Sequence, residues 1–167
     1  MKQVEATNQI LEQVNKKEFI EGRQFVTFIL EDEEYGVDIV QVQEIIGYKK
    51  PTLLPNVASF IKGVINLRGN VIPVVDVREK FRMSAREVDA STVVMIIEVE
   101  GKTMGMIVDG VSDVVMLDDK DIQPTPQFTS KINTEFIRGM GRKNKKFIIL
   151  LDIDQVLSER ELEAFNA

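Results

Sequence analysis

Aspartates are the side chains of this sequence that could carry acid–base or metal chemistry. Those that could pair for proton transfer or hold a divalent cation are Asp76, Asp109, Asp113, Asp118, Asp119 and Asp121. The run Asp118-Asp-Lys-Asp121 lacks the glycine and the distal glutamate of a calcium loop. Asp76 also recurs as Asp152 at the equivalent place of an internal repeat, which favours a role in capping the helix that follows. A carboxylate-based, metal-dependent enzyme therefore stands only as an alternative.

The sequence contains neither cysteine nor histidine. This excludes disulfides, thiolate nucleophiles, imidazole bases and imidazole metal ligands. No glycine-rich phosphate loop or dinucleotide-binding fingerprint appears either. We therefore predict no catalytic residue, no metal site and no cofactor, and we expect that the chain is not an enzyme.

The charge of the chain limits the partners that it can bind. Its net charge of -6 and pI near 4.9 argue against binding a nucleic-acid backbone or lying on an anionic membrane. No apolar stretch approaches the roughly 18 residues that would span a bilayer, and the first residues lack an apolar signal core. We expect a cytoplasmic protein whose partner is a protein or a small ligand.

The stretch from Phe60 to Asp76 organises the rest of the sequence. Its two apolar runs are broken by the polar group Arg68-Gly69-Asn70. Because Gly69 can adopt the positive φ of a short hairpin loop, residues 63–67 and 71–75 are predicted to pair as antiparallel strands. Arg68 then lies at the tip, where its planar guanidinium can reach a partner, although an ordinary solvated turn is the alternative.

Other apolar runs predict further short strands and a closing helix. Residues 1–21 are polar and predict a flexible leader, either a frayed helix or disorder. The segment 39–46 fits either a short helix or a strand. The remaining predicted elements are strands at 25–30, 35–38, 92–99, 103–108, 111–117, 136–140 and 147–151, and an amphipathic helix that includes Ile153, Val156 and Leu157.

One pattern of residues occurs twice in the chain. The segment Phe60-Ile-Lys-Gly-Val is echoed by Phe136-Ile-Arg-Gly-Met, and Tyr35-Gly36 by Met104-Gly105. Two copies of about five short strands predict a mainly all-β fold of two small barrels that share an apolar seam. The expected divisions are a leader at 1–21, a first lobe at 22–84, a second lobe at 85–157 and a helix end and tail at 158–167. Exchange of strands between the lobes is left open.

Several segments resemble the CheW family of bacterial chemotaxis coupling proteins. They are Glu33-Glu-Tyr-Gly-Val-Asp-Ile39, Val42-Gln-Glu-Ile45, Phe60-Ile-Lys-Gly-Val-Ile-Asn-Leu-Arg-Gly69, Val71-Ile-Pro-Val-Val-Asp76, Gly105-Met-Ile-Val-Asp-Gly-Val-Ser-Asp-Val114 and Ile148 to Asp152. The resemblance implies a pair of SH3-like five-stranded barrels that act as a non-catalytic adaptor. It also implies two partners, the cytoplasmic tip of a methyl-accepting chemoreceptor and the regulatory domain of the histidine kinase CheA, met in membrane-associated arrays. No small-molecule substrate, nucleic acid or direct membrane insertion is expected.

The same resemblance assigns residues to the two partners. Val42, Arg68 and Val114 match positions of receptor contact, and Glu44, Ile45, Lys62 and Gly63 match positions that face the kinase. A receptor tip is a helical hairpin, so Val42 and Val114 would line an apolar groove that takes an amphipathic helix. From the residues alone, both valines could equally be buried in a core, and Gly63 could be glycine because a backbone passes close by.

Two further interpretations belong to related classes of protein. The chain could be the equivalent regulatory domain of a kinase, or an adaptor fused to a receiver domain; its start at Met1 and its end soon after the closing helix favour a free-standing adaptor. The second interpretation is an SH3-like module that binds a peptide or a nucleic acid. Because the sequence has two tyrosines, no tryptophan and an acidic balance, it shows neither an aromatic proline-binding groove nor a phosphate track.

Overall fold

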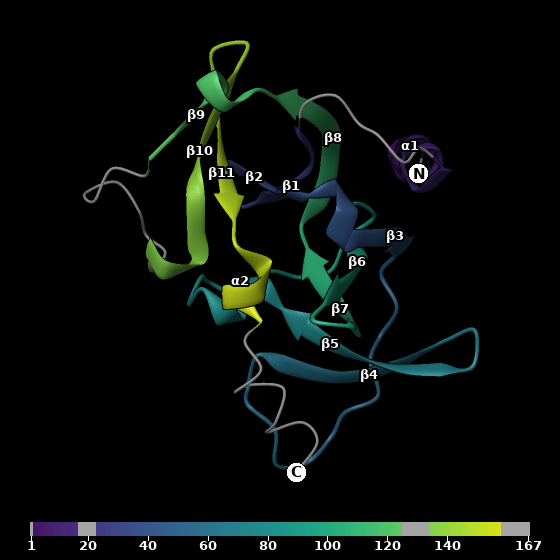
Figure 1. Ribbon diagram of the computed structural model, residues 1–167. Coiled ribbons are helices and arrows are strands. Elements are labelled where there is room, and N and C mark those ends of the chain that lie inside the picture. Colours follow the sequence, from purple (N-terminus) through teal and green to yellow (C-terminus); the bar gives the residue numbers. More distant parts are fainter. Residues whose placement is uncertain (1, 17–22, 125–133, 158–167) are drawn as a thin grey trace.

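Five strands form one sheet, here called sheet B, in a computed structural model that describes residues 2–16, 23–124 and 134–157. Their order is β3-β6-β7-β5-β4 (Figure 1). The β4–β5 hairpin predicted around Arg68 is confirmed, and Arg68 and Gly69 both have positive φ, 51° and 86°. Such a turn matches the twist of the paired strands. The strands are β3 (Val42–Gly47), β4 (Ile61–Leu67), β5 (Asn70–Asp76), β6 (Val93–Val99) and β7 (Lys102–Val108).

The second sheet, sheet A, has six strands in the order β8-β1-β2-β11-β10-β9. The additional strand, β9, is two residues long and pairs with β10 at the edge of the sheet. Its counterpart in sheet B is a single bridge between Thr52 and Val64, so both sheets still follow one plan. The strands are β1 (Arg23–Leu30), β2 (Glu33–Asp38), β8 (Gly110–Leu117), β9 (Ile122–Gln123), β10 (Ile137–Lys143) and β11 (Lys146–Leu151).

The two sheets do not follow the predicted division into lobes at 22–84 and 85–157. Sheet A combines β1 and β2 of the first half with β8 to β11 of the second, and sheet B combines β3 to β5 with β6 and β7. Each half therefore gives its first hairpin to the other half's barrel. The chain changes from sheet A to sheet B between β2 and β3, which only the 3₁₀ turn η1 (Ile39–Gln41) separates.

The internal repeat is seen in the pairing of equivalent glycines. Gly36 of β2 pairs in parallel with Leu150 of β11, and Gly105 of β7 pairs in parallel with Val74 of β5. A Cβ on Gly36 would lie 3.1 Å from the Leu150 side chain, and one on Gly105 would lie 2.8 Å from Val94. Glycine is therefore required by close packing inside each barrel.

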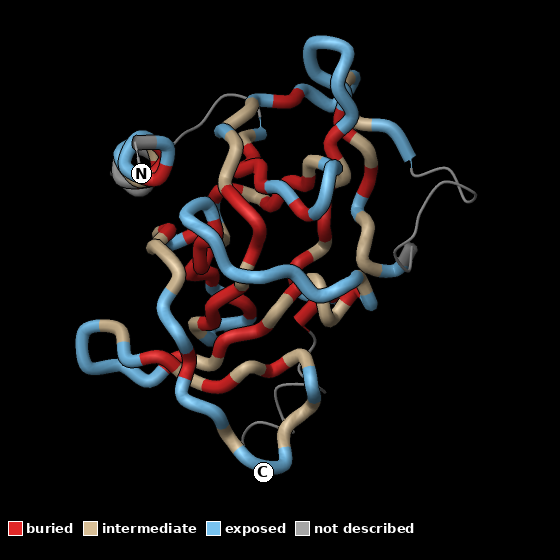
Figure 2. Tube along the Cα trace, turned by 180° about the vertical axis from the view of Figure 1, so that it is seen from behind, coloured by how far each residue is buried: buried red, intermediate tan, exposed pale blue. Residues whose placement is uncertain are grey.

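The described residues form three apolar clusters in the core. A small cluster around Ile72, Val74 and Ile96 lies within sheet B, and its counterpart around Ile148 and Leu150 lies within sheet A. The largest cluster contains residues of both sheets, which is the apolar seam that the sequence predicts. Figure 2 shows these buried residues along the strands of both sheets, while the turns are exposed.

The first residues of the chain form a helix that packs on the barrels, although the sequence predicts a flexible leader at 1–21. Helix α1 (Lys2–Lys16) buries Val4, Thr7 and Leu11 and contacts β3 and β8 (Figure 1). Of the two alternatives given for the leader, the helix is present at residues 2–16, while residues 17–21 lie outside the described residues. The sequence does not indicate that this helix docks, because its apolar residues are few and burying them needs a surface that only the folded barrels provide.

Two short helices follow the equivalent strands β5 and β11. The Asp76 carboxylate accepts from the backbone N–H of Arg78 at 3.0 Å and begins α2 (Val77–Lys80). Asp152 accepts from Gln155 N–H and begins α3 (Ile153–Val156). The capping roles predicted from the repeat are confirmed.

Two predicted segments remain, the tail at 158–167 and the segment at 39–46. The predicted helix end and tail at 158–167 lie outside the described residues. The alternative at 39–46 is decided in favour of a strand, because β3 begins at Val42 after one 3₁₀ turn. Within the described ranges, none of the helices is long and apolar enough to cross a membrane.

Candidate protein-binding surface

Arg68 and Glu44 meet at the edge of sheet B. Arg68 lies at the tip of the β4–β5 hairpin with 71% of its side chain exposed, and its guanidinium forms an ion pair with the Glu44 carboxylate on β3. This hydrogen bond raises the pKa of Arg68. The turn beneath is held by a 2.9 Å hydrogen bond from Gly69 N–H to the Asn66 side chain. The two side chains assigned to different partners therefore form one exposed pair.

The other predicted receptor residues are less accessible. Val42, at the start of β3, is only 3% exposed and belongs to the core cluster that both sheets share. Val114, on β8, is half-buried and packs against the same cluster. The structural role that the sequence left open for these valines is therefore present, and their contact with a receptor stays a prediction.

Among the predicted kinase residues, Ile45 is the most deeply buried side chain. It is 1% exposed on β3, and its backbone N–H and carbonyl both hydrogen-bond to the side chain of Asn8 in α1. Lys62, on β4, is half-exposed and forms an ion pair with Glu79 of α2. Glu44, Ile45 and Lys62 thus lie on neighbouring elements but do not form one exposed cluster.

Gly63 is held by the backbone of the loop beside it. It has a φ of 137°, and a Cβ built there would lie 2.0 Å from the carbonyl oxygen of Thr52. Thr52 and Val64 exchange two backbone hydrogen bonds at 2.8 and 2.9 Å, which hold this loop in place. The close backbone that the sequence offered as one explanation for Gly63 is present. Its contact with a kinase stays a prediction.

A buried charge cluster that the sequence does not reveal lies between the barrels. Asp109 is 6% exposed and accepts hydrogen bonds from Arg78 at 2.6 Å, from Arg86 at 3.0 Å and from the backbone N–H of Glu31 at 2.8 Å. The Arg78 guanidinium also donates to the carbonyl of Ser84. The cluster joins the β1–β2 turn to α2 and to the connector that follows. Asp109 is among the carboxylates noted in the sequence and lies in the family segment 105–114, but no pattern in the sequence pairs it with Arg78 or Arg86.

These geometries leave little scope for carboxylate chemistry. Asp109 is surrounded by donors, and Asp76 caps α2, while Asp121 accepts from the backbone N–H of Asp118. Burial is the main cause that raises the pKa of Asp76. Within the part of the chain that the structure describes, no group of three or more acidic residues could hold a metal ion. Each of these aspartates has a structural role instead.

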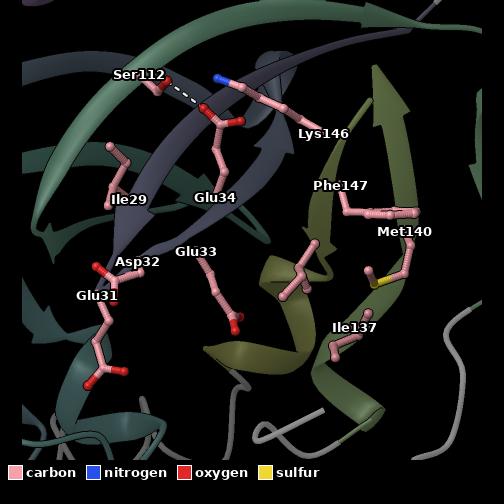
Figure 3. A pocket seen from close by; sticks show the side chains of 11 residues that line it. Ile29, Glu31, Asp32, Glu33, Glu34, Ser112, Ile137, Met140, Lys146 and Phe147 are labelled. Carbon is pink, nitrogen blue, oxygen red and sulfur yellow. Dashed lines mark hydrogen bonds between the residues drawn. The ribbon is translucent and has the colours of Figure 1, made fainter. Parts of the chain in front are cut away.

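Equivalent grooves on the two barrels carry opposite charge. An open groove of about 740 Å³ on sheet A is bordered by the acidic β1–β2 turn, and Figure 3 shows Glu31 and Asp32 on one side of it and Phe147 and Met140 on the other. Residues that line it include Glu31, Asp32, Glu33, Glu34, Ser112, Lys146 and Phe147. The equivalent groove on sheet B, about 490 Å³, is lined by Arg68 and Lys102 together with Gln43, Asn70, Val71 and Pro73. We call these the acidic groove and the basic groove.

Comparison with known proteins places this architecture among chemotaxis proteins. The model of the CheW-like domain family matches residues 24–161. The chain is 43% identical over 141 residues to the chemotaxis protein CheW of Klebsiella aerogenes, covering 84% of this chain and 85% of that one. It is 37% identical to the chemotaxis protein CheW of Rhizobium meliloti, covering 86% and 92%. The crystal structure of scaffolding protein TtCheW from Thermoanaerobacter tengcongensis matches with a TM-score of 0.78 and 33% identity, covering 84% and 96%.

Proposed function

The chain belongs to the CheW-like domain family of chemotaxis scaffold proteins, and we propose that this member couples chemoreceptors to a histidine kinase. The prediction that it is not an enzyme is confirmed, because the family consists of non-catalytic adaptors. The proposed partners are the cytoplasmic tip of a methyl-accepting chemoreceptor and the regulatory domain of CheA. The proposal places the protein in the cytoplasm, recruited to receptor arrays through protein contacts.

The observation that carries the proposal is the exposed Arg68–Glu44 pair beside the basic groove. An arginine fork that is already oriented loses less freedom when a carboxylate or carbonyl of a partner replaces Glu44. The equivalent hairpin of sheet A has Asn144 and Lys145 at its tip, so the repeat itself does not require an arginine there. This difference favours a role for Arg68 in binding over one in folding.

The receptor arm of the proposal is tested with Arg68→Asn. Asparagine tolerates the positive φ of Arg68, so the turn is kept while the guanidinium is lost. In co-sedimentation with receptor signalling fragments and the kinase, we expect Arg68→Asn to lower the amount of receptor in the complex more than the amount of kinase. The matched control is Lys145→Asn at the other tip, which should leave both amounts unchanged. Equal loss of both partners, or the same loss in the control, would contradict the assignment.

The kinase arm is tested with Lys62→Gln, because Gly63 cannot be changed without disturbing Thr52. Lys62 pairs with Glu79, and the repeat places Arg138 at the equivalent position, where it pairs with Asp38 at 3.7 Å. We expect Lys62→Gln to weaken capture of the isolated kinase regulatory domain, while Arg138→Gln does so less. Unchanged kinase capture by folded Lys62→Gln would remove this residue from the proposed interface.

A further inference from the structure

Helix α1 covers the free edges of both sheets at once. β3 is the outer strand of sheet B and β8 is the outer strand of sheet A, and α1 contacts both. The repeat makes these strands equivalent, with Ile45 of β3 matching Val114 of β8. Figure 1 shows α1 end-on beside β8 and β3. We call the surface beneath α1 the edge groove.

The apolar contact of α1 is made by one face of the helix. Val4, Thr7 and Leu11 are 9%, 1% and 2% exposed, while Glu5, Ala6 and Gln9 face solvent. Val4 and Leu11 belong to the same core cluster as Ile45, and Val114 packs against that cluster. The spacing of three and four residues is that of an amphipathic helix seated in an apolar groove.

Among the side chains described in α1, residues 3–11, the carboxamide of Asn8 makes the polar contact with β3. The Asn8 side chain accepts from Ile45 N–H at 3.0 Å and donates to the Ile45 carbonyl at 3.0 Å. Since β3 has a neighbouring strand only on its β6 side, these two groups would otherwise lack a partner within the sheet. The amide of Asn8 therefore takes the place of the missing strand, and it fixes how a helix must lie along β3.

These contacts also hide residues that the proposed function needs. Ile45, a predicted kinase residue, is hydrogen-bonded to the helix through its backbone. Val114, a predicted receptor residue, lies on β8, which α1 contacts, and packs against the cluster that contains Val4 and Leu11. Within residues 3–11, α1 is held on the barrels by the buried Val4, Thr7 and Leu11, the half-buried Ile10 and the Asn8 amide. A partner helix that covers more of the groove can therefore compete with it.

We propose that α1 occupies, within the same chain, the groove that receives a partner helix, so that binding requires displacement of α1. The partner is an amphipathic helix with an asparagine or glutamine that has apolar residues four positions before it and three positions after it, as Asn8 has Val4 and Leu11. This inference rests on the proposed function, in which the partner helix belongs to a chemoreceptor tip. It adds that the free chain is self-inhibited at that surface.

The test compares the parent chain with Leu11→Ala, which weakens the seat of α1, and with Gln9→Ala on the exposed face as control. Because an occupied groove lowers the apparent affinity by the fraction of chains that are open, Leu11→Ala should bind a receptor signalling fragment about 10-fold more tightly than the parent. Gln9→Ala should match the parent. Hydrogen exchange should show the amides of α1 losing protection when the fragment binds. Equal affinities together with α1 amides that stay protected in the complex would overturn the inference.

A second arm does not depend on the receptor. A synthetic peptide of residues 2–16, added to the full-length Leu11→Ala chain, should bind and shift the Ile45 amide resonance, and the same peptide with Asn8→Ala should bind more weakly. Failure of the peptide to bind would overturn the edge groove as a helix site. If the peptide binds but no receptor fragment does, the groove stands and the proposed receptor partner fails.

Discussion

The barrel of sheet B and the barrel of sheet A share one plan of strands, bulges and caps, but they are not equally constrained. Both have a register shift before the equivalent glycines, at Gly63 and at Gly139. Among the residues that the structure describes, an arginine–carboxylate ion pair at a hairpin tip occurs in the B barrel alone, and of the helices α2 and α3 only α2 has a side chain that pairs with the buried Asp109. We infer that the duplicated plan supplies stability, and we expect binding and the joining of the barrels to depend on features present in a single copy.

The largest effect on stability is expected from replacing Gly63 with alanine, compared with the same change at Gly139, its equivalent in the repeat. A Cβ on Gly63 would lie 2.0 Å from Thr52 O at a φ of 137°, whereas one on Gly139 would lie 3.1 Å from Gln123 O. Gly63→Ala should lower the free energy of unfolding by at least about 3 kcal/mol, and Gly139→Ala by about 1 kcal/mol. Urea unfolding of both variants measures the difference. Equal losses of unfolding free energy would contradict the prediction that the backbone at Thr52 restricts Gly63 more tightly than the backbone at Gln123 restricts Gly139.

Removing the buried carboxylate should have the next largest effect. Asp109→Asn leaves Arg78 and Arg86 without their anion, and the loss in unfolding free energy should be about 3 kcal/mol. The control is Asp154→Asn, at the position equivalent to Arg78, where the carboxylate accepts only a 3.3 Å hydrogen bond from Gln41. That variant should change stability by less than about 0.5 kcal/mol. A stable Asp109→Asn would show that the cluster does not join the barrels.

A smaller, pH-dependent effect is expected at Asp76. Burial raises its pKa above 3.8, so the folded state binds this proton more tightly than the unfolded state. The resulting stability is complete below pH 3.8 and is lost as the pH rises through the folded pKa. Asp76→Asn keeps an oxygen that can cap α2 but cannot ionise. From about pH 3 to about pH 7 its stability should therefore improve relative to the parent, by under about 1 kcal/mol because the half-exposed carboxyl is screened. A flat difference between the two stability curves would contradict the shift.

The smallest effect on stability is expected at the hairpin tips. Because the Arg68–Glu44 pair is exposed, Arg68→Asn should leave the Tm unchanged within error, as should Lys145→Asn. Thermal unfolding of both variants checks this. A fall in Tm of several degrees for Arg68→Asn alone would mean that the arginine supports the fold, and its proposed role in binding would lose its basis.

The local structure could be predicted from the sequence in considerable detail. The β4–β5 and β6–β7 hairpins follow from apolar runs on either side of Arg68-Gly69 and Glu100-Gly101, and the caps at Asp76 and Asp152 follow from the repeat. These features depend on neighbours in the chain, and a turn residue or a capping carboxylate acts within a few positions of itself. The resemblance to the CheW family likewise depended on contiguous residues, and the family match confirms it.

The tertiary structure alone decided which barrel each strand joins. Since the two halves repeat one pattern, the first hairpin of either half fits either barrel, and the parallel pairings of Gly36 with Leu150 and of Gly105 with Val74 join residues far apart in sequence. The docking of α1 and the cluster around Asp109 have the same origin. The Asp109 cluster and the docked helix α1 are stabilised by contacts with surfaces that exist only after the chain has folded. The apolar runs of the sequence specify which segments are buried, but not which neighbour buries them.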